Sequence, residues 1–224
     1  MRKFKLIIFD CDGVLVDSER ITTNVFSKIL QEECGLIINT EKLLETFMGQ
    51  SSEKCLSIIE DMLGYPPPSD LAINYQSAIR NALQESVTSI HGIEKVLTEI
   101  NIPYCVASGG SHEKMKITLG KTDLLKYFEG RIFSTSDVSR AKPNPDIFLH
   151  AAKIMSNTNP KDCLVVEDSP LGVHAGVAAG MTVFAYSDLI EKQKLYDAGA
   201  HHVFFDMSDL TDEITSYEHK SSLK

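Results

Sequence analysis

The chain has 224 residues, of which 43% are hydrophobic, and a formal net charge of −9. A chain of this length forms one large domain, or one domain with a smaller insertion, and can bury roughly 70% of the surface that it exposes when unfolded. The negative charge argues against a general nucleic-acid binder, because such proteins normally carry a basic face. A phosphorylated ligand would have to be held by local cations and helix N-termini, since the net charge does not attract it.

The cysteines and the hydrophobic runs indicate where the protein works. An odd, scattered set of cysteines without a Cys-x-x-Cys pair is typical of reduced thiols in a cytosolic protein, and the five are Cys11, Cys34, Cys55, Cys105 and Cys163. The apolar run 6–9 is too short for the hydrophobic part of a signal peptide, and no run reaches the length of a membrane span. We therefore expect a cytoplasmic protein with neither a membrane nor a nucleic acid as partner.

Two acidic residues follow the first predicted strand. The run Phe4–Ile8 is short and apolar, which predicts a buried strand, and Asp10 and Asp12 come directly after it. Residues i and i+2 of an extended chain share a side, so both carboxylates can point into one pocket, and Gly13 then allows a sharp turn. Two carboxylates this close repel each other unless a cation lies between them or one is protonated, which suggests a Mg²⁺ site combined with acid–base chemistry. We expect Cys11 between them to be a small packed residue rather than a reactive thiol.

The stretch 19–86 has a helical pattern and no strand signal. Hydrophobic residues recur at helical spacing in four consecutive segments, and the first three segments run to a glycine, at Gly35, Gly49 and Gly64. The fourth segment follows three prolines, and Ser69–Asp70 is expected to cap it. We therefore predict a small all-helical domain over residues 18–87, inserted after the first strand.

Beyond residue 88 the pattern alternates between short strands and longer helices. We predict strands over 103–107, 131–133, 163–166, 182–185 and 203–205, and helices over 93–100, 112–119, 146–155 and 172–179. This alternation predicts an α/β fold, a Rossmann-like, doubly wound parallel sheet with right-handed crossovers, made of residues 1–17 and 88–224. The polar tail from Thr215 is expected to be frayed.

Three of the predicted strands end in polar or acidic groups. In open α/β sheets, ligands bind beyond the carboxyl ends of the strands, and these ends carry Asp10 with Asp12, Ser108, and Glu167 with Asp168. Several acids together offer oxygen ligands, which suit Mg²⁺ rather than zinc. No histidines and cysteines have the spacing of metal ligands, and we expect the adjacent histidines 201–202 to lie at the surface or to be satisfied by hydrogen bonds.

Two further features are suited to binding phosphate. Ser108 could be a nucleophile, but no His or Asp lies nearby in a triad pattern. We expect it instead to hydrogen-bond a phosphate oxygen, with Gly109 and Gly110 letting backbone N–H groups approach closely. Lys142 precedes the segment Pro143–Pro145, whose two prolines fix the loop, so it presents a point charge for phosphate.

Four motifs, in order, give the chain a resemblance to a known family. They are Asp10–Ser18 (DCDGVLVDS), Ala107–Gly110 (ASGG), Ala141–Pro145 (AKPNP) and Val166–Gly172 (VEDSPLG). On these motifs, which span nearly the whole chain, the sequence resembles the haloacid dehalogenase superfamily. The helical insertion resembles the α-helical cap of its β-phosphoglucomutase-like branch, and the run 118–128 is similar to bacterial sugar phosphatases of the 6-phosphogluconate phosphatase kind.

The resemblance implies a role for each of the four acids. Asp10 would attack phosphorus and form an aspartyl-phosphate, and Asp12 would protonate the leaving oxygen and then deprotonate the attacking water. The cofactor Mg²⁺ would be held by the Asp10 carboxylate, the Asp12 backbone carbonyl and Asp168, with Glu167 reaching it directly or through water.

The resemblance also implies which residues bind the substrate. Ser108 and Lys142 would grip the phosphoryl oxygens, with Gly109 and Gly110 beside them. Substrate choice would lie with the cap, on the loop Gly49, Gln50 and Ser51, whose neutral side chains can hydrogen-bond sugar hydroxyls.

These roles lead to a Mg²⁺-dependent phosphatase that hydrolyses a small phosphorylated sugar or sugar acid, and that is a monomer or a weak dimer. Dehalogenation is disfavoured, because dehalogenases lack an acid at the position of Asp12. A β-phosphoglucomutase-type mutase is the alternative, although the cap histidine and arginine of such mutases fall here on Thr22 and Ser52. A second alternative is a non-catalytic sugar-phosphate-binding module on the same fold.

Overall fold

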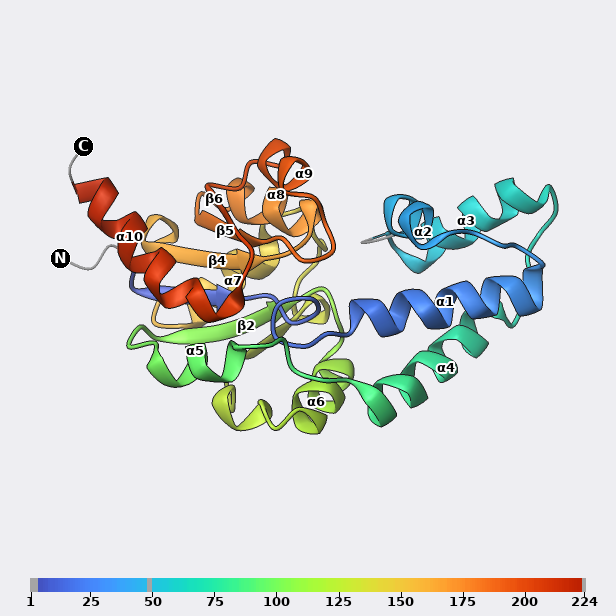
Figure 1. Cartoon of the computed structure of the whole chain (residues 1–224), viewed down its shortest axis with the longest axis horizontal. Helices are drawn as coiled ribbons and strands as arrows, with labels where there is room; N and C mark the ends of the chain where they lie inside the picture. Colours follow the sequence, from blue (N-terminus) through green and yellow to red (C-terminus); the bar gives the residue numbers. More distant parts are fainter. Residues whose placement is uncertain (1–3, 48–49, 223–224) are drawn as a thin grey trace. The chain divides into compact units, whose positions relative to one another are not determined.

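The chain divides into two compact units. The computed structural model describes residues 4–47 and 50–222 (Figure 1). One unit comprises Met1–Asp17 and Thr88–Lys224, and the other comprises Ser18–Val87. The first unit contains a sheet with helices, and the second contains only helices among its described residues.

The α/β unit is built on six parallel strands. They run in the order β3-β2-β1-β4-β5-β6, with β1 Leu6–Phe9, β2 Tyr104–Ser108, β3 Ile132–Ser134, β4 Cys163–Glu167, β5 Thr182–Tyr186 and β6 His202–Phe204. The strand order reverses between β1 and β4, which pair directly, with Phe9 opposite Val166. This arrangement confirms the predicted Rossmann-like fold, and its reversal point is where such sheets bind ligands.

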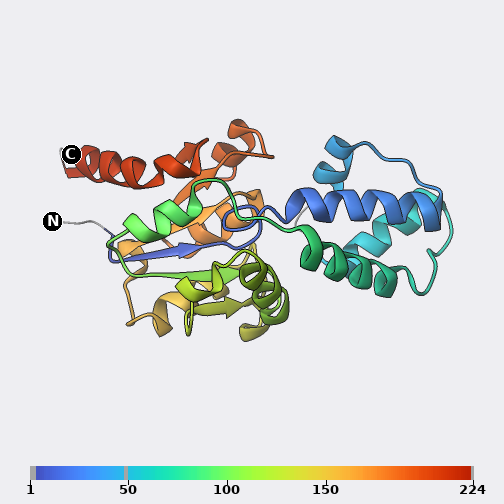
Figure 2. The same cartoon turned by 60° about the horizontal axis from the view of Figure 1, so that its bottom comes forward.

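Helices cover both faces of the sheet (Figure 2). One face carries α5 (Ile93–Glu99), α6 (His112–Lys121) and α10 (Leu210–Ser222), and the other carries α7 (Asp146–Ile154), α8 (Pro170–Ala178) and α9 (Lys192–Asp197). Right-handed crossovers produce this division, because the chain moves in opposite directions along the sheet before and after β3. Strands covered on both sides are mostly apolar, and every residue of β1, β4 and β5 is buried, including the polar residues Glu167 and Thr182.

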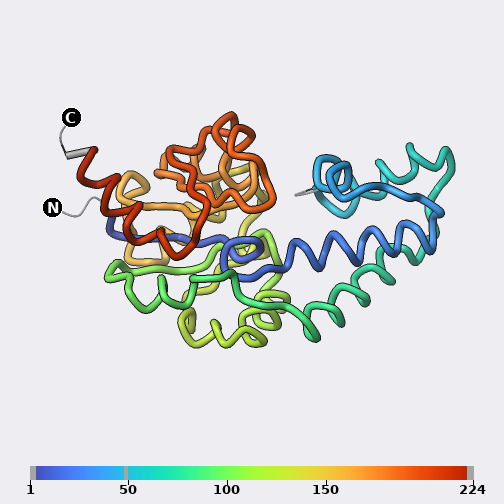
Figure 3. The backbone as a smooth tube through the Cα atoms, viewed as in Figure 1, coloured from blue at the N-terminus to red at the C-terminus, as the bar shows by residue number. Residues whose placement is uncertain are grey.

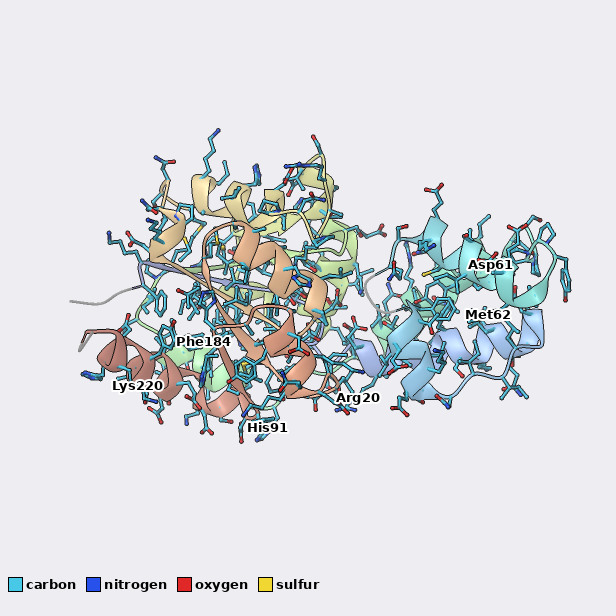
Figure 4. The ribbon with its side chains drawn as sticks, turned by 90° about the horizontal axis from the view of Figure 1, so that it is seen from above. Arg20, Asp61, Met62, His91, Phe184 and Lys220 are labelled. Carbon is cyan, nitrogen blue, oxygen red and sulfur yellow. The ribbon has the colours of Figure 1, made fainter. Side chains whose placement is uncertain are left out.

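The C-terminal segment is a docked helix, so the prediction of a frayed tail from Thr215 was wrong. Figure 3 shows this end of the chain beside the N-terminal stretch, and Figure 4 labels Phe184 in the same unit. The Tyr217 ring stacks on Phe4 with centroids 6.2 Å apart and meets Phe184 edge-on at 5.0 Å. Ile214, one turn earlier, is also buried. The polar composition of the tail conceals one apolar stripe at helical spacing, and that stripe packs on the sheet.

The helical unit contains α1 (Glu19–Cys34), α2 (Thr40–Phe47), α3 (Ser52–Leu63) and α4 (Leu71–Ser86). Helices α1 and α4 lie side by side (Figure 2), and the core between the helices centres on Leu30, Phe47 and Ile59. Gly35 and Gly64 end α1 and α3 with left-handed backbone, as the sequence predicts. Asp70 precedes α4, but its side chain makes no capping hydrogen bond, because its backbone is already helical rather than extended.

Across the described residues, no helix has both the length and the apolar character needed to span a bilayer.

The docking of α10 predicts a measurable contribution to stability. Replacing Tyr217 by alanine removes its contacts with Phe4 and Phe184 and should lower the free energy of unfolding by about 1–3 kcal/mol. Tyr65, which is 59% exposed, provides the matched control. Tyr65→Ala should change the free energy of unfolding by less than about 0.5 kcal/mol. Urea unfolding of the two variants measures both values, and equal effects would show that α10 is not held by this ring.

Candidate active site

The acidic strand ends predicted from the sequence come together in the α/β unit. Asp10 follows β1, and Glu167 and Asp168 lie at the end of its neighbour β4. One carboxylate oxygen from each of these three residues can be chosen so that all three atoms lie within 4.8 Å of one another. All three side chains are buried, Glu167 most completely at 1% exposure. Three buried acids at this spacing are stabilised by a nearby positive charge or by protonation of one of them.

Lys142 supplies part of that charge. Its Nζ donates to Asp10 Oδ1 at 2.6 Å, to Glu167 Oε1 at 2.7 Å and to the Ala107 carbonyl at 3.3 Å. It also lies 4.7 Å from the centroid of the Phe148 ring. Burial alone would lower the pKa of Lys142, but the attraction of the two carboxylates outweighs it and raises the pKa above its ordinary value. The lysine is therefore a fixed cation at this site.

The Glu167 carboxylate is held on both of its oxygens. Besides the bond from Lys142 to Oε1, Oε2 accepts hydrogen bonds from the backbone N–H of Asp168 and of Ser169, both at 3.0 Å, and from Ser169 Oγ at 2.9 Å. Ser169 Oγ also caps α8 by accepting the Gly172 N–H at 3.1 Å. A Cβ on Gly172 would overlap the Glu167 carboxylate. The glycine in the motif 166–172 therefore makes room for the acid.

The electrostatics of Asp10 favour a bound cation. The pKa of Asp10 is raised to about 7, mainly by burial and also by the nearby Glu167 and Asp12, although the attraction of Lys142 lowers it. A cation among the acids would stabilise the ionised form of Asp10. The donor set consists only of carboxylate oxygens, which suits a hard divalent ion rather than zinc. The residues present therefore fit the metal ion that the sequence analysis anticipated.

The loop after β1 is shaped by Gly13 and contains Asp12. The φ angle of Gly13 is +74°, and a Cβ there would overlap the Asp168 carboxylate. The Asp12 carboxylate pairs with Lys114 of α6, with Oδ1 and Nζ 2.9 Å apart. Cys11 is buried with its Sγ 4.0 Å from Thr118 Oγ1. Because burial raises the pKa of the Cys11 thiol well above its ordinary value, its geometry and environment fit a packed residue rather than a reactive thiol.

Two serines hold the loop after β2 in place by hydrogen bonds. The buried Ser108 Oγ accepts the Gly110 N–H at 3.0 Å. Ser134, which pairs with Ser108 in the neighbouring strand β3, donates its hydroxyl to the Gly110 carbonyl at 2.8 Å. Gly109 lies exposed at the turn between them. The loop predicted to bind phosphate is thus held at Gly110 from two directions.

The predicted cap residues belong to the helical unit. Gln50 lines a cavity of about 210 Å³ in this unit, and Phe26, Phe47 and Ile59 also line this cavity. Ser51 caps α3, because its Oγ accepts the Lys54 N–H at 3.2 Å. Gly49 lies outside the described residues.

Lys114 is a site residue that the sequence analysis missed. Its local signal is the pattern Ser111-x-x-Lys114 at the start of α6, where a basic residue occupies a position usually taken by an acid. The two histidines near the last strand are satisfied, as expected. His201 Nδ1 accepts the Val183 N–H at 3.1 Å, and His202 Nε2 lies 2.9 Å from Glu213 Oε2.

A parallel α/β sheet with buried acids at the tips of two adjacent strands, and a lysine bridging them, is the arrangement that the resemblance to haloacid dehalogenase-type hydrolases leads us to expect. The family model for haloacid dehalogenase-like hydrolases matches residues 7–186. The chain belongs to this family, which confirms the resemblance seen in its motifs and the prediction that it is an enzyme.

Individual relatives cover most of the chain. The 6-phosphogluconate phosphatase of Escherichia coli K12 is 34% identical over 187 residues, which are 83% of this chain and 84% of that protein. A haloacid dehalogenase-like protein of unknown function from Agrobacterium tumefaciens superposes with a TM-score of 0.88 at 36% identity, covering 96% of this chain and 99% of that one. A family hydrolase from Deinococcus radiodurans, solved with bound phosphate and sodium, has a TM-score of 0.82 at 27% identity over 96% and 97%.

The close approach of Gly172 to Glu167 leads to a testable prediction. Gly172→Ala must displace the Glu167 carboxylate, so it should lower the free energy of unfolding by about 1–3 kcal/mol. Gly120 is a matched control, because it lies in α6 with open space at its Cβ position, and Gly120→Ala should be neutral or stabilising by up to about 1 kcal/mol. Urea unfolding midpoints compare the two, and a neutral Gly172→Ala would refute this account of the motif.

Proposed function

We propose that this protein is a phosphatase that hydrolyses a small phosphorylated sugar or sugar acid through an aspartyl-phosphate on Asp10, with Mg²⁺ as cofactor. The observation that carries the proposal is the position of Asp10, buried between Lys142 and the acids Glu167 and Asp168. The phosphatase name of the Escherichia coli relative supports the reaction class and a phosphorylated sugar acid as a candidate substrate.

The buried acids are the proposed holders of the metal ion. Asp10, Asp168 and Glu167 would offer carboxylate oxygens to the metal ion. The backbone carbonyl of Asp12 would be a further oxygen ligand from the protein. A bound Mg²⁺ would offset the repulsion between an anionic nucleophile and an anionic phosphoryl group. At ~4 Å that repulsion is about 4 kcal/mol per pair of charges at an effective dielectric constant of 20.

The chain's own residues can carry both half-reactions. In the first, an Asp10 oxygen forms a bond to phosphorus as the bond to the substrate oxygen breaks, and Asp12 gives that oxygen its proton. In the second, Asp12 takes a proton from water as the water oxygen attacks phosphorus, and the bond to Asp10 breaks. The products are the dephosphorylated sugar and inorganic phosphate, and both acids return to their starting states.

Ser108 and Lys142 are the proposed phosphate-binding residues. The Ser108 oxygen accepts the Gly110 N–H, so its own hydroxyl proton can be donated to a phosphoryl oxygen. Lys142 is held in place by two carboxylates and a carbonyl, so its charge is preorganised for the developing charge on the phosphoryl group. Gly109 and Gly110 would contribute backbone N–H groups.

The lining of the helical-unit cavity supports water, rather than a second sugar phosphate, as the acceptor. Thr22 and Ser52, the positions where the mutase resemblance would require a histidine and an arginine, both line this cavity. None of its described lining residues is a lysine, arginine or histidine. The described lining of this cavity therefore gives the helical unit no cation there that could bind a second phosphate group. Gln50, which also lines the cavity, can instead hydrogen-bond sugar hydroxyls.

Phosphate release from a panel of sugar phosphates, with Mg²⁺ and with a chelator, tests the proposal. We expect hydrolysis that requires the metal and falls by at least about a thousandfold in Asp10→Asn, because the nucleophile is lost. Asp61, an exposed acid on α3 (Figure 4), is the control, and Asp61→Asn should keep full activity.

Three outcomes of this assay would contradict the proposal. Hydrolysis that survives in Asp10→Asn would remove Asp10 as the nucleophile. Conversion of β-glucose 1-phosphate to glucose 6-phosphate, primed by the bisphosphate and without phosphate release, would indicate a mutase. Binding of sugar phosphates without turnover would indicate a sensor module.

A further inference from the structure

Lys114 of α6 reaches the loop after β1 and contacts Asp12. Its Nζ lies 2.9 Å from Asp12 Oδ1, and the two side chains are 29% and 13% exposed. A Cβ on Gly110 would lie 3.4 Å from Asp12 Oδ2, 3.5 Å from Lys114 Cδ and 3.5 Å from Ser108 Oγ. The lysine, the Asp12 carboxylate and the Ser108 hydroxyl therefore lie around one position, beside Gly110.

The helix itself does not explain a lysine at this position. Ser111 caps α6 by accepting the Lys114 backbone N–H at 3.2 Å, so Lys114 is the third residue of the helix. Helix N-termini favour acidic side chains, and Glu or Gln is the common partner of a capping serine at this position. A cation here is repelled by the helix dipole. Its attraction to the Asp12 carboxylate, 102 positions away in the sequence, opposes that repulsion.

The two lysines of the site contact different acids. Lys142 touches Asp10 and Glu167, the proposed nucleophile and a proposed metal ligand. Lys114 touches Asp12, the proposed acid and base. Lys142 is therefore placed to act on the transferring phosphoryl group, whereas Lys114 is placed to act on Asp12, the residue proposed to move the proton.

We propose that Lys114 is a positioning residue for Asp12, an inference that rests on the proposed function. When Asp12 gives its proton to the leaving oxygen, the substrate O–P bond breaks, the bond from Asp10 to phosphorus forms, and Asp12 is left as a carboxylate. The Lys114 ammonium stabilises that carboxylate and holds its orientation until it takes a proton from water. In this role Lys114 acts through the Asp12 carboxylate, to which it is paired, and not directly on the phosphoryl group.

This role predicts a dependence on the leaving group, which a structural lysine or a phosphate-binding lysine would not produce. Proton donation matters most when the leaving oxygen is a strong base. Phenyl phosphate and 4-nitrophenyl phosphate make a matched pair, because the nitro group stabilises the departing phenoxide without a proton. A residue that acts through Asp12 should therefore affect phenyl phosphate far more.

The experiment compares kcat/KM for the two esters in the presence of Mg²⁺. For Lys114→Met we expect a loss of about tenfold or more with phenyl phosphate and less than about threefold with 4-nitrophenyl phosphate. Lys114→Arg should restore part of the loss. Lys116, an exposed lysine on the same helix, is the control, and Lys116→Met should leave both rates unchanged. A partly unfolded sample lowers both rates equally, so the ratio of the two losses reports the role, and Lys114→Gln provides a second neutral variant.

Asp12→Asn, measured in parallel, separates the two proposals. Suppose that Asp12→Asn loses more kcat/KM with phenyl phosphate than with 4-nitrophenyl phosphate, whereas Lys114→Met lowers both values equally or leaves both unchanged. The inference about Lys114 is then overturned, and the proposed function stands. If Asp12→Asn itself shows no selectivity, the acid role of Asp12 fails, and the role of Lys114 fails with it.

Discussion

The buried ion pairs of Lys142 are the interaction on which the rest of the site depends. Burying a carboxylate without a partner is very unfavourable, and here three carboxylates lie together at the edge of a sheet. Lys142 bonds to two of them at 2.6 and 2.7 Å. A single lysine cannot balance three acids, and the remaining negative charge makes the site suited to a divalent cation and, with that cation bound, to a phosphoryl group.

The fold brings these charges together through its strand order. Strands β1 and β4 are neighbours although more than 150 residues separate them, because the sheet reverses its order between them. The acids that follow the two strands are therefore held at one edge by a rigid ladder of hydrogen bonds. Gly13 and Gly172 complete the arrangement, since a side chain at either position would overlap the carboxylate of Asp168 or Glu167. The presence of glycine at these two motif positions thus has a steric explanation.

Periodicity and strand-end chemistry were enough to predict the sheet and the acids at its edge, because both depend on short stretches of sequence. The pattern missed α9, which has only six residues and a single buried side chain, Leu195. It also misjudged the tail, where one apolar stripe on a polar helix is recognised only when its partners Phe4 and Phe184 are known. Lys114 was not predicted as a site residue, for a related reason. Its partner Asp12 is remote in sequence, and nothing in its own segment marks it apart from the unusual place of a cation at a helix start.

The most direct test of the account is to locate the cation itself. Crystals grown with Mn²⁺, which prefers the same carboxylate oxygens as Mg²⁺ and scatters anomalously, show where the ion lies. We predict one strong anomalous peak in direct contact with carboxylate oxygens of Asp10 and Asp168, which disappears in Asp168→Asn crystals. A peak elsewhere, or none at saturating Mn²⁺, would contradict the claim that these strand ends are built around a metal ion.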